Sequence, residues 1–241
     1  MGFLLLKKIL KENLPKEIDP ATAVVCGMDE VGRGPWAGPV VACGLILHKD
    51  PRIKGLKDSK QLSAQRREQI YEKLKRCAHI GIGKAEAEEI DDLGLTKATR
   101  LAFKRALEEL TSQTGKTEQL TKALVPDILL IDGRDKLNLP ILAKSIIKGD
   151  EKVKVIACAS IVAKVERDRI MCKAANKYPE YGFSIHKGYG TARHQKALAK
   201  YGVCDIHRKS FKPIAQPDFQ EHRMLKTKKA SPARDDAFKN E

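Results

Sequence analysis

The chain has 241 residues, with 46 lysines and arginines against 31 aspartates and glutamates, and its formal net charge at pH 7 is +15. This length suits one domain with short appendages, and the excess of positive charge favours a polyanionic partner, above all nucleic acid. The six cysteines form no CxxC pair, and the CxxH spacing of Cys204 and His207 lacks a second pair, which argues against a disulfide scaffold and a zinc site.

The beginning of the chain, MGFLLLKKIL, contains an apolar run that is too short for a signal peptide or a membrane span. We therefore expect a cytoplasmic protein with no membrane contact. Residues 1–20 are expected to form an N-terminal extension that contains a short amphipathic helix. Residues 21–215 are expected to form the folded domain, and residues 216–241, which have little apolar content, a flexible basic tail.

Two β-rich runs, residues 23–29 (AVVCGMD) and 39–47 (PVVACGLIL), predict neighbouring strands joined by a glycine-rich connection. That connection does not fit a nucleotide-binding loop. A dinucleotide fingerprint must open a helix, whereas a second strand follows these glycines, and a P-loop needs a Gly-Lys-Ser/Thr sequence that does not occur here. We therefore expect no nucleotide cofactor.

The rest of the pattern mixes helices and strands. Ser63 is the expected N-cap of the next helix, Thr191 is expected to cap the last helix, and Gly202 is expected to follow its end. In chain order the elements between are a helix at 62–77, a strand at 79–86, a helix at 96–110, strands at 126–133 and 144–150, and a long helix at 154–178. The predicted fold class is α/β, with a mixed, partly antiparallel central sheet flanked by helices and a helical C-terminal part.

Four acidic residues follow or adjoin short apolar runs, namely Asp29, Glu30, Asp132 and Asp150. One acid at a strand end is usually a turn residue, but four at successive element ends suggest a cluster. Clustered carboxylates repel one another unless a divalent cation neutralises them, and a ligand set made only of oxygen favours Mg²⁺ or Mn²⁺. Two such ions about 3.5 to 4 Å apart activate a water molecule and stabilise the leaving oxygen of a phosphodiester displacement.

Asp29 and Glu30 pose a geometric difficulty, because consecutive residues of a regular strand point to opposite faces. Either the glycines that begin at Gly32 allow the chain to bend, or Glu30 contributes its main-chain carbonyl, which is also a hard oxygen ligand. The sequence leaves both alternatives open.

Several motifs occur together, in one order, between residues 24 and 213. They are DEVGRGPWAGPVV, LKDSKQLS, ATRLAFKRAL, LLIDG, IIKGD, CASIVAKVERDRIM, YPEYGF, HKGYGT followed by His194, and HRKSF. With these motifs the sequence resembles the type 2 ribonucleases H, and specifically ribonuclease HII. The resemblance implies a ribonuclease H-like fold in which residues 21–215 form the catalytic domain. Its C-terminal helical part, about residues 173–215, would help to bind the duplex.

The resemblance also implies an activity. Enzymes of this family are endonucleases that use two metal ions to hydrolyse the phosphodiester 5′ of a ribonucleotide, in RNA/DNA hybrids and at single ribonucleotides embedded in duplex DNA. The products carry 3′-hydroxyl and 5′-phosphate ends, and the cut initiates removal of the ribonucleotide from DNA. The catalytic and metal-binding acids of the family fall on Asp29, Glu30, Asp132 and Asp150.

The same matching implies contacts with the substrate. The main chain of Gly32, Arg33 and Gly34 would contact the ribose 2′-hydroxyl, the group that distinguishes RNA from DNA. Tyr189 would pack on the deoxyribose just 3′ of the ribonucleotide, and Lys60 would contact a phosphate. Without the motifs, the glycines would indicate only a tight turn and the tyrosine only half-buried packing.

Other charged residues carry weaker signals. Asp168 competes with the four acids, but its place in a predicted helix favours a structural ion pair. Arg66 and Arg67 are interpreted as solvated helix residues. Lys164 and Arg167 remain open between phosphate contacts and intramolecular ion pairs.

Two other functions compete with this one. A ribonuclease HIII-like enzyme would cut long RNA/DNA hybrids but not single ribonucleotides; that type carries a sizeable extra N-terminal domain, and the short segment before residue 21 favours HII. A non-catalytic binder of hybrid duplexes would suit the charge of +15, but an acidic cluster without metal would repel phosphate. Nothing in the sequence requires more than a monomer.

Overall fold

The computed structural model describes residues 2–53, 56, 62–112, 125–134 and 139–215. Within these residues a five-stranded mixed sheet has the order β3-β2-β1-β4-β5. The strands are β1 (Val25–Val31), β2 (Val40–Leu47), β3 (Ala78–Ala85), β4 (Ile128–Asp132) and β5 (Ala143–Ile146). The helices are α1 (Gly2–Asn13), α2 (Ala64–Leu74), α3 (Ala87–Leu93), α4 (Leu95–Thr111), α5 (Gly149–Lys152), α6 (Lys154–Lys177), α7 (Phe183–His186) and α8 (Ala192–Tyr201), with a 3₁₀ turn η2 at Pro179–Tyr181.

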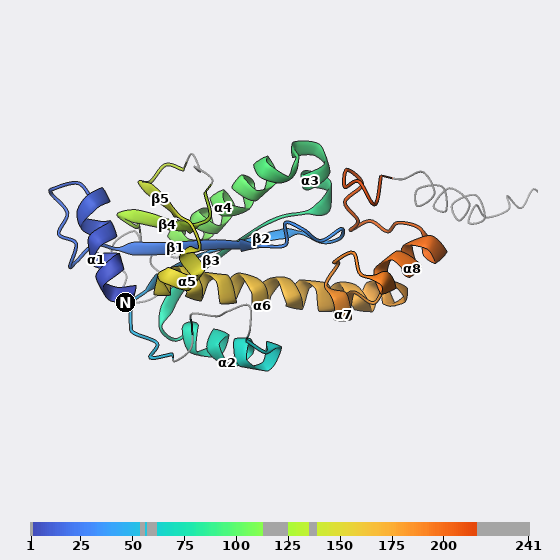
Figure 1. Cartoon of the computed structure of the whole chain (residues 1–241), viewed down its shortest axis with the longest axis horizontal. Helices are drawn as coiled ribbons and strands as arrows, with labels where there is room; N and C mark the ends of the chain where they lie inside the picture. Colours follow the sequence, from blue (N-terminus) through green and yellow to red (C-terminus); the bar gives the residue numbers. More distant parts are fainter. Residues whose placement is uncertain (1, 54–55, 57–61, 113–124, 135–138, 216–241) are drawn as a thin grey trace, which may run out of the picture.

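The sheet is covered by helices on both faces, with α4 on one side and α6 and α2 on the other (Figure 1). The expected pairing of the first two strands is confirmed, because β1 and β2 are antiparallel neighbours. β1 also pairs in parallel with β4, which pairs in parallel with β5. The α/β class with a mixed, partly antiparallel sheet is therefore confirmed. Since Met28 pairs with Ile131, the ends of β1 and β4 lie side by side.

Alternation along β1 sends neighbouring side chains to opposite faces of the sheet. Cys26 and Met28 belong to the core beneath α4. Gly27 faces α6, and a Cβ placed on it would lie 2.5 Å from a main-chain carbon of that helix, so only glycine allows this close packing. The core beneath α6 also contains Ile9 and Leu10, through which α1 packs on the domain.

The predicted caps of two helices are confirmed. Ser63 caps α2, since its side chain accepts a hydrogen bond from the main-chain N–H of Arg66 at 3.2 Å. Thr191 caps α8 in the same way, through the N–H of His194 at 3.3 Å. Gly202 ends α8 with a φ of 71°, a conformation that favours glycine.

The predicted strand at 144–150 is wrong in its extent. It ends at Ile146, and Asp150 lies in the short helix α5 instead. Lys148 adopts a left-handed conformation with a φ of 55°, which turns the chain before α5, and Gly149 then packs closely against α6. The isoleucines favour a strand locally, but the contact with α6 decides the course of the chain.

The C-terminal part is helical, as predicted, and has a core of its own. Tyr181, Phe183 and Leu198 are buried in it, and the rings of Tyr181 and Phe183 stack with centroids 5.3 Å apart. Across the described part of the chain, no helix combines the length and the apolar composition that a bilayer span requires.

Candidate active site

Three of the four predicted acids meet where β1 and β4 end. One carboxylate oxygen from each of Asp29, Asp132 and Asp150 lies within 4.8 Å of the other two. Asp29 and Asp150 are buried, with exposed fractions of 6% and 5%, whereas Asp132 is half-buried. Three carboxylates at this spacing offer the oxygen ligands that hard divalent cations prefer.

A hydrogen bond from the main chain to the side chain of Asp132 brings Asp150 beside Asp132. The N–H of Gly149 donates to Oδ1 of Asp132 over 2.6 Å. Because Gly149 begins α5, this bond holds the first turn of that helix against the end of β4. Asp150 follows Gly149 directly. The helix α5, which the sequence did not predict, therefore brings the third carboxylate into the cluster.

The surroundings of Asp29 disfavour its charged form. Burial raises the pKa of the Asp29 carboxyl well above its usual range, and the negative charges of Glu30 and Asp132 add to the increase. A hydrogen bond with Ser160 of α6 lowers this pKa, as does the one that Oδ1 accepts from the N–H of Glu30 at 2.8 Å. A divalent cation among the three acids would offset both the burial and the repulsion.

Glu30 is not one of the three carboxylates that converge within 4.8 Å, and alternation along a regular strand separates its side chain from that of Asp29. Its carboxylate pairs with Arg33, with Oε1 and Nη1 3.5 Å apart. Glu30 lines a small hollow beside α4 and also the hollow that contains the three aspartates. Burial raises the pKa of Glu30, and the charge of Arg33 opposes that shift. β1 stays in register with β2 through Val31, so the strand runs without a bend at Glu30. A contribution through its main-chain carbonyl stays a prediction.

The three aspartates and Glu30 line a hollow of about 370 Å³ that cationic side chains also line. Lys164 and Arg67 both line it, and both pair with Asp168, at 2.7 Å and 3.7 Å. The structural ion pairs predicted for Asp168 are therefore confirmed, and Lys164 is one of its partners. The interpretation of Arg67 as a solvated residue is wrong, because only 14% of its side chain is exposed.

A buried arginine holds the connection between β1 and β2, residues 32–39, which we call the GRG loop. Arg167 has no exposed surface, and it donates to the carbonyl oxygens of Pro39 at 3.0 Å, Ala37 at 3.1 Å and Lys187 at 3.0 Å. Both interpretations that the sequence left open for Arg167, a phosphate contact or an ion pair, are therefore wrong. Its task is to satisfy loop carbonyls that would otherwise be buried without donors.

A second buried arginine, Arg208, holds the same loop from the C-terminal side. Its guanidinium donates to the carbonyl oxygens of Gly32 at 2.6 Å, Arg33 at 3.0 Å and Gly38 at 2.7 Å. Burial, and next the charge of Arg167, lower the pKa of Arg208 to about 9, so it stays charged at neutral pH. Sequence reasoning missed this residue, although the HRKSF motif contains it.

The two glycines of the GRG motif have different reasons to be glycine. Gly32 has a φ of 95°, and a Cβ placed on it would lie 2.2 Å from Nε of Arg167, so the fold itself excludes other residues. A Cβ on Gly34 would meet only Cε1 of Tyr189, at an ordinary 3.9 Å. Tyr189 is 42% exposed and lines the hollow of the acids. The fold therefore leaves space between Gly34 and Tyr189 that a side chain at position 34 would narrow.

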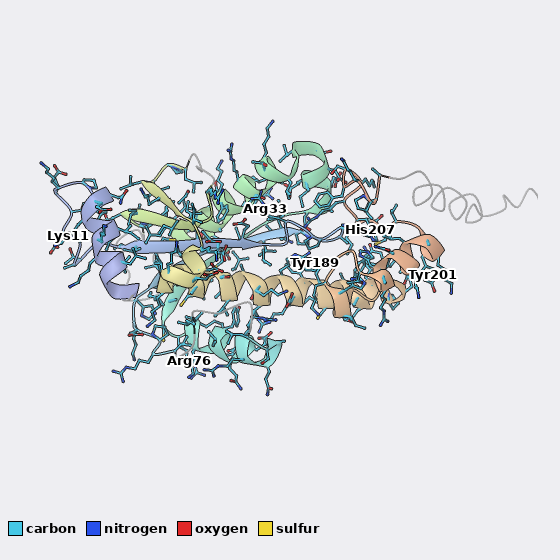
Figure 2. The ribbon with its side chains drawn as sticks, viewed as in Figure 1. Lys11, Arg33, Arg76, Tyr189, Tyr201 and His207 are labelled. Atoms are coloured by element: carbon cyan, nitrogen blue, oxygen red, sulfur yellow. The ribbon has the colours of Figure 1, made fainter. Side chains whose placement is uncertain are left out.

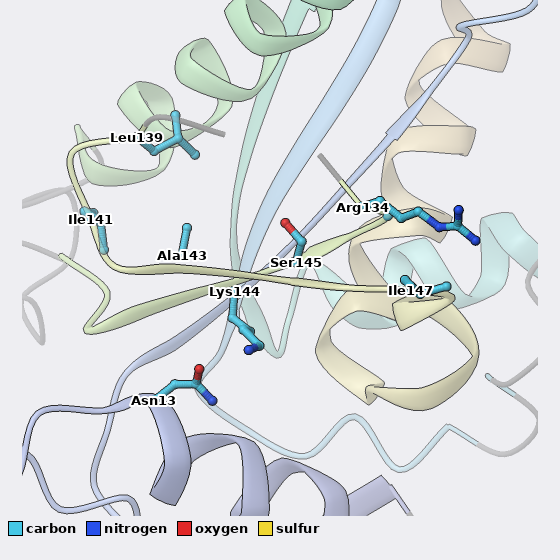
Figure 3. Close-up of a pocket in the computed structure, with 9 residues that line it drawn as sticks. Asn13, Arg134, Leu139, Ile141, Ala143, Lys144, Ser145 and Ile147 are labelled. Carbon is cyan, nitrogen blue, oxygen red and sulfur yellow. The ribbon is translucent and has the colours of Figure 1, made fainter. Parts of the chain in front are cut away.

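A larger hollow of about 760 Å³ lies beside the edge strand β5 (Figure 3). Asn13 of α1, Arg134 and Lys144 line it together with apolar residues. None of the described residues that line it is acidic, so it offers no carboxylate to a metal ion. The smaller hollow with the three acids is the candidate active site.

Known proteins resemble this chain over most of its length. A family model described as Ribonuclease HII matches residues 26–214. A ribonuclease HII from Coxiella burnetii is 45% identical over 198 residues, which cover 82% of this chain and 92% of the relative. A ribonuclease HII from Polynucleobacter necessarius is 48% identical over 191 residues, which cover 79% of this chain and 93% of the relative. The crystal structure of the ribonuclease H2 from Pyrococcus horikoshii OT3 aligns with a TM-score of 0.65 at 26% identity, covering 83% of this chain and 98% of that chain. The chain belongs to the ribonuclease HII family.

A ribonuclease HII is a metal-dependent ribonuclease H, an endonuclease that acts on nucleic acid. In this ribonuclease HII the DE, IDG and KGD motifs supply the acids, and the GRG and KGYGT motifs meet beside them. Lys60 lies outside the described residues, so its phosphate contact stays a prediction.

Proposed function

We propose that this ribonuclease HII hydrolyses the phosphodiester 5′ of a ribonucleotide, in RNA/DNA hybrids and at single ribonucleotides embedded in duplex DNA, leaving 3′-hydroxyl and 5′-phosphate ends. The observation that carries the proposal is that three carboxylates and the exposed ring of Tyr189 line one hollow, while Gly34 of the GRG loop faces that ring. Acids alone would not discriminate between sugars, and this discrimination is assigned to the loop and the ring. The cut initiates removal of the ribonucleotide from DNA. One chain supplies the three carboxylates, the GRG loop and Tyr189, so we propose that the enzyme acts as a monomer.

Asp29, Asp132 and Asp150 would hold the divalent cations, Mg²⁺ or Mn²⁺, with Glu30 contributing through its main-chain carbonyl. Cations held there would supply an activated water for the attack and would offset charge on the leaving oxygen. The raised pKa of Asp29 supports this assignment, because buried acids that repel one another gain most from a cation.

The GRG loop is proposed to recognise the ribose. Main-chain groups of Gly32, Arg33 and Gly34 would contact the 2′-hydroxyl, which requires a backbone that a sugar can approach closely. Because Arg208 already binds the carbonyl oxygens of Gly32 and Arg33, the loop is ordered before substrate arrives, and little entropy is lost on binding. Lys164 and Arg67 line the same hollow, and we expect them to attract the substrate phosphates on either side of the cleaved phosphodiester.

The experiment that tests the proposal uses a labelled DNA duplex that carries one ribonucleotide, beside a continuous RNA/DNA hybrid. Each is incubated with Mg²⁺, with Mn²⁺ and with a chelator. We expect metal-dependent cleavage 5′ of the single ribonucleotide. Cleavage of the hybrid alone would assign the HIII-like specificity, and binding without cleavage under either metal would show that the acids do not serve catalysis.

Replacing Tyr189 by Ala should lower the ratio of single-ribonucleotide to hybrid cleavage by about tenfold, since the lost packing on the deoxyribose is of order 1.4 kcal/mol. The ratio of the initial rates on the two substrates measures this effect. Tyr189→Phe is the matched control and should keep the ratio, because the ring is retained. Equal losses of Tyr189→Ala on both substrates would refute a role of Tyr189 at the junction.

A further inference from the structure

Both main-chain groups of Tyr189 bond to buried histidines. Its N–H donates to the carbonyl oxygen of His186 at 2.9 Å. Its carbonyl oxygen accepts from the N–H of Thr191 at 2.8 Å and from Nδ1 of His194 at 3.0 Å. Nδ1 of His186 also accepts from the N–H of Gly188 at 3.2 Å. Hydrogen bonds therefore hold both the N–H and the carbonyl of Tyr189, while its ring is exposed.

The hydrogen bonds determine which nitrogen of each ring carries the proton. A carbonyl oxygen only accepts, so Nδ1 of His194 donates to Tyr189, and Nε2 of the neutral His194 ring must accept. Nε2 of His207 lies 3.0 Å from it and therefore donates. Nδ1 of His207 in turn accepts from the N–H of Cys204 at 2.9 Å. We call this series of hydrogen bonds, from Cys204 through His207 and His194 to Tyr189, the histidine relay.

The histidine relay adjoins the residue that holds the GRG loop, because Arg208 follows His207. The N–H of Arg208 donates to the carbonyl oxygen of Trp36, and the N–H of Trp36 donates to that of Gly188, both at 2.8 Å. The GRG loop and the segment that carries Tyr189 are thus joined through main-chain bonds. Figure 2 shows Tyr189 and His207 between the sheet and α8.

We propose that His194 and His207 are positioning residues, which set the place of Tyr189 relative to the GRG loop and thereby the preference for a ribonucleotide followed by a deoxyribonucleotide. This inference rests on the proposed function. Apolar side chains would fill the same core, but only directed hydrogen bonds fix the carbonyl of Tyr189 at one distance.

The protonation of the two rings agrees with this role. Burial lowers the pKa of His194 to about 4 and that of His207 to about 3, so both rings are neutral when the enzyme works near neutral pH. A second proton on His194 would turn its Nε2 into a donor that faces the donor of His207. The neutral rings leave every nitrogen of the relay with a partner.

The test is a double-mutant cycle read as the ratio of single-ribonucleotide to hybrid cleavage. This ratio is taken within one preparation, so it does not depend on the folded fraction. We expect His194→Leu, which removes the donor to Tyr189, to lower the ratio roughly 10-fold, within the range that small misplacements cause. Tyr189→Ala combined with His194→Leu should lower it no further than Tyr189→Ala alone. His194→Asn, whose amide can still donate to the carbonyl, should restore most of the ratio.

His79→Leu on β3 is the matched control and should leave the ratio unchanged. If His194→Leu slows both substrates equally, or if its loss multiplies with that of Tyr189→Ala, the histidines do not act through Tyr189 and the inference is overturned.

Hydrogen exchange separates this inference from the proposed function. In the full chain without substrate, the amides of Gly188 and Tyr189 should exchange at least several-fold faster in His194→Leu than in the wild type or in His79→Leu. If Tyr189→Ala leaves the cleavage ratio unchanged, the junction role fails, yet faster exchange would still establish the positioning. Unchanged exchange would overturn the positioning itself.

Discussion

Replacing Asp29 by Asn is expected to lower the rate of cleavage by more than roughly 10³-fold while duplex binding is retained or improved. The substitution removes one of the three carboxylates that lie within 4.8 Å of one another, and with it several kcal/mol of metal-assisted stabilisation of the transition state. Binding does not suffer, because a negative charge near phosphate is removed. Cleavage of the single-ribonucleotide duplex with Mg²⁺ and with Mn²⁺, and fluorescence anisotropy without metal, measure the two effects.

The same substitution is expected to stabilise the metal-free protein. Because the pKa of Asp29 is raised by burial and by its acidic neighbours, its contribution to stability is full below the unfolded pKa and is lost as the pH rises through the folded pKa. At pH 7 the free energy of unfolding of Asp29→Asn should therefore exceed that of the wild type. The difference should close as the pH falls toward about 4.

The matched control for both effects is Asp92→Asn, which changes an exposed acid of α3 outside the cluster. It should keep its activity and alter stability by less than about 0.5 kcal/mol. Added Mg²⁺ should stabilise the wild type more than Asp29→Asn, since only the intact cluster binds the ion well. Full activity of Asp29→Asn, or equal stabilisation of both by Mg²⁺, would remove Asp29 from the metal site.

Replacing Arg208 by Met should lower the free energy of unfolding by about 2 to 4 kcal/mol. The guanidinium is fully buried and donates to the carbonyls of Gly32, Arg33 and Gly38, which would be left buried without donors. Arg208→Lys should rescue little, because one ammonium group cannot reproduce the planar fork that reaches three carbonyls. Urea denaturation of the full chain measures the change.

Arg76→Met, at an exposed arginine, is the control and should change stability by less than about 0.5 kcal/mol. If Arg208→Met unfolds at the same urea concentration as the wild type, the loop carbonyls find other donors and Arg208 does not hold the loop.

Much of the fold could be predicted from local patterns. The antiparallel pair β1–β2, the helix caps at Ser63 and Thr191 and the strand that ends at Asp132 all rest on hydrophobic periodicity and capping chemistry, which act over a few residues. The prediction that this strand extends to Asp150 was wrong, because close packing of Gly149 against α6 overrides the strand preference of the isoleucines.

The candidate site also has a part that the sequence predicted and a part that only the structure shows. Asp29, Glu30, Asp132 and Asp150 were found from their places after apolar runs, together with the motif context. Only the three aspartates converge, while the carboxylate of Glu30 pairs with Arg33, and this difference follows from strand alternation along the unbent β1.

The sequence by itself determined the acids, the glycines that the GRG loop needs, the main elements of the sheet and the family. Only the tertiary structure decided what Arg167, Arg208, His194 and His207 do. Their side chains are buried, so each must find hydrogen-bond partners. The most distant of these partners lies 130 residues away for Arg167, at Ala37, and 176 residues away for Arg208, at Gly32. No pattern along a short stretch can name such partners, because the packing of distant segments selects them.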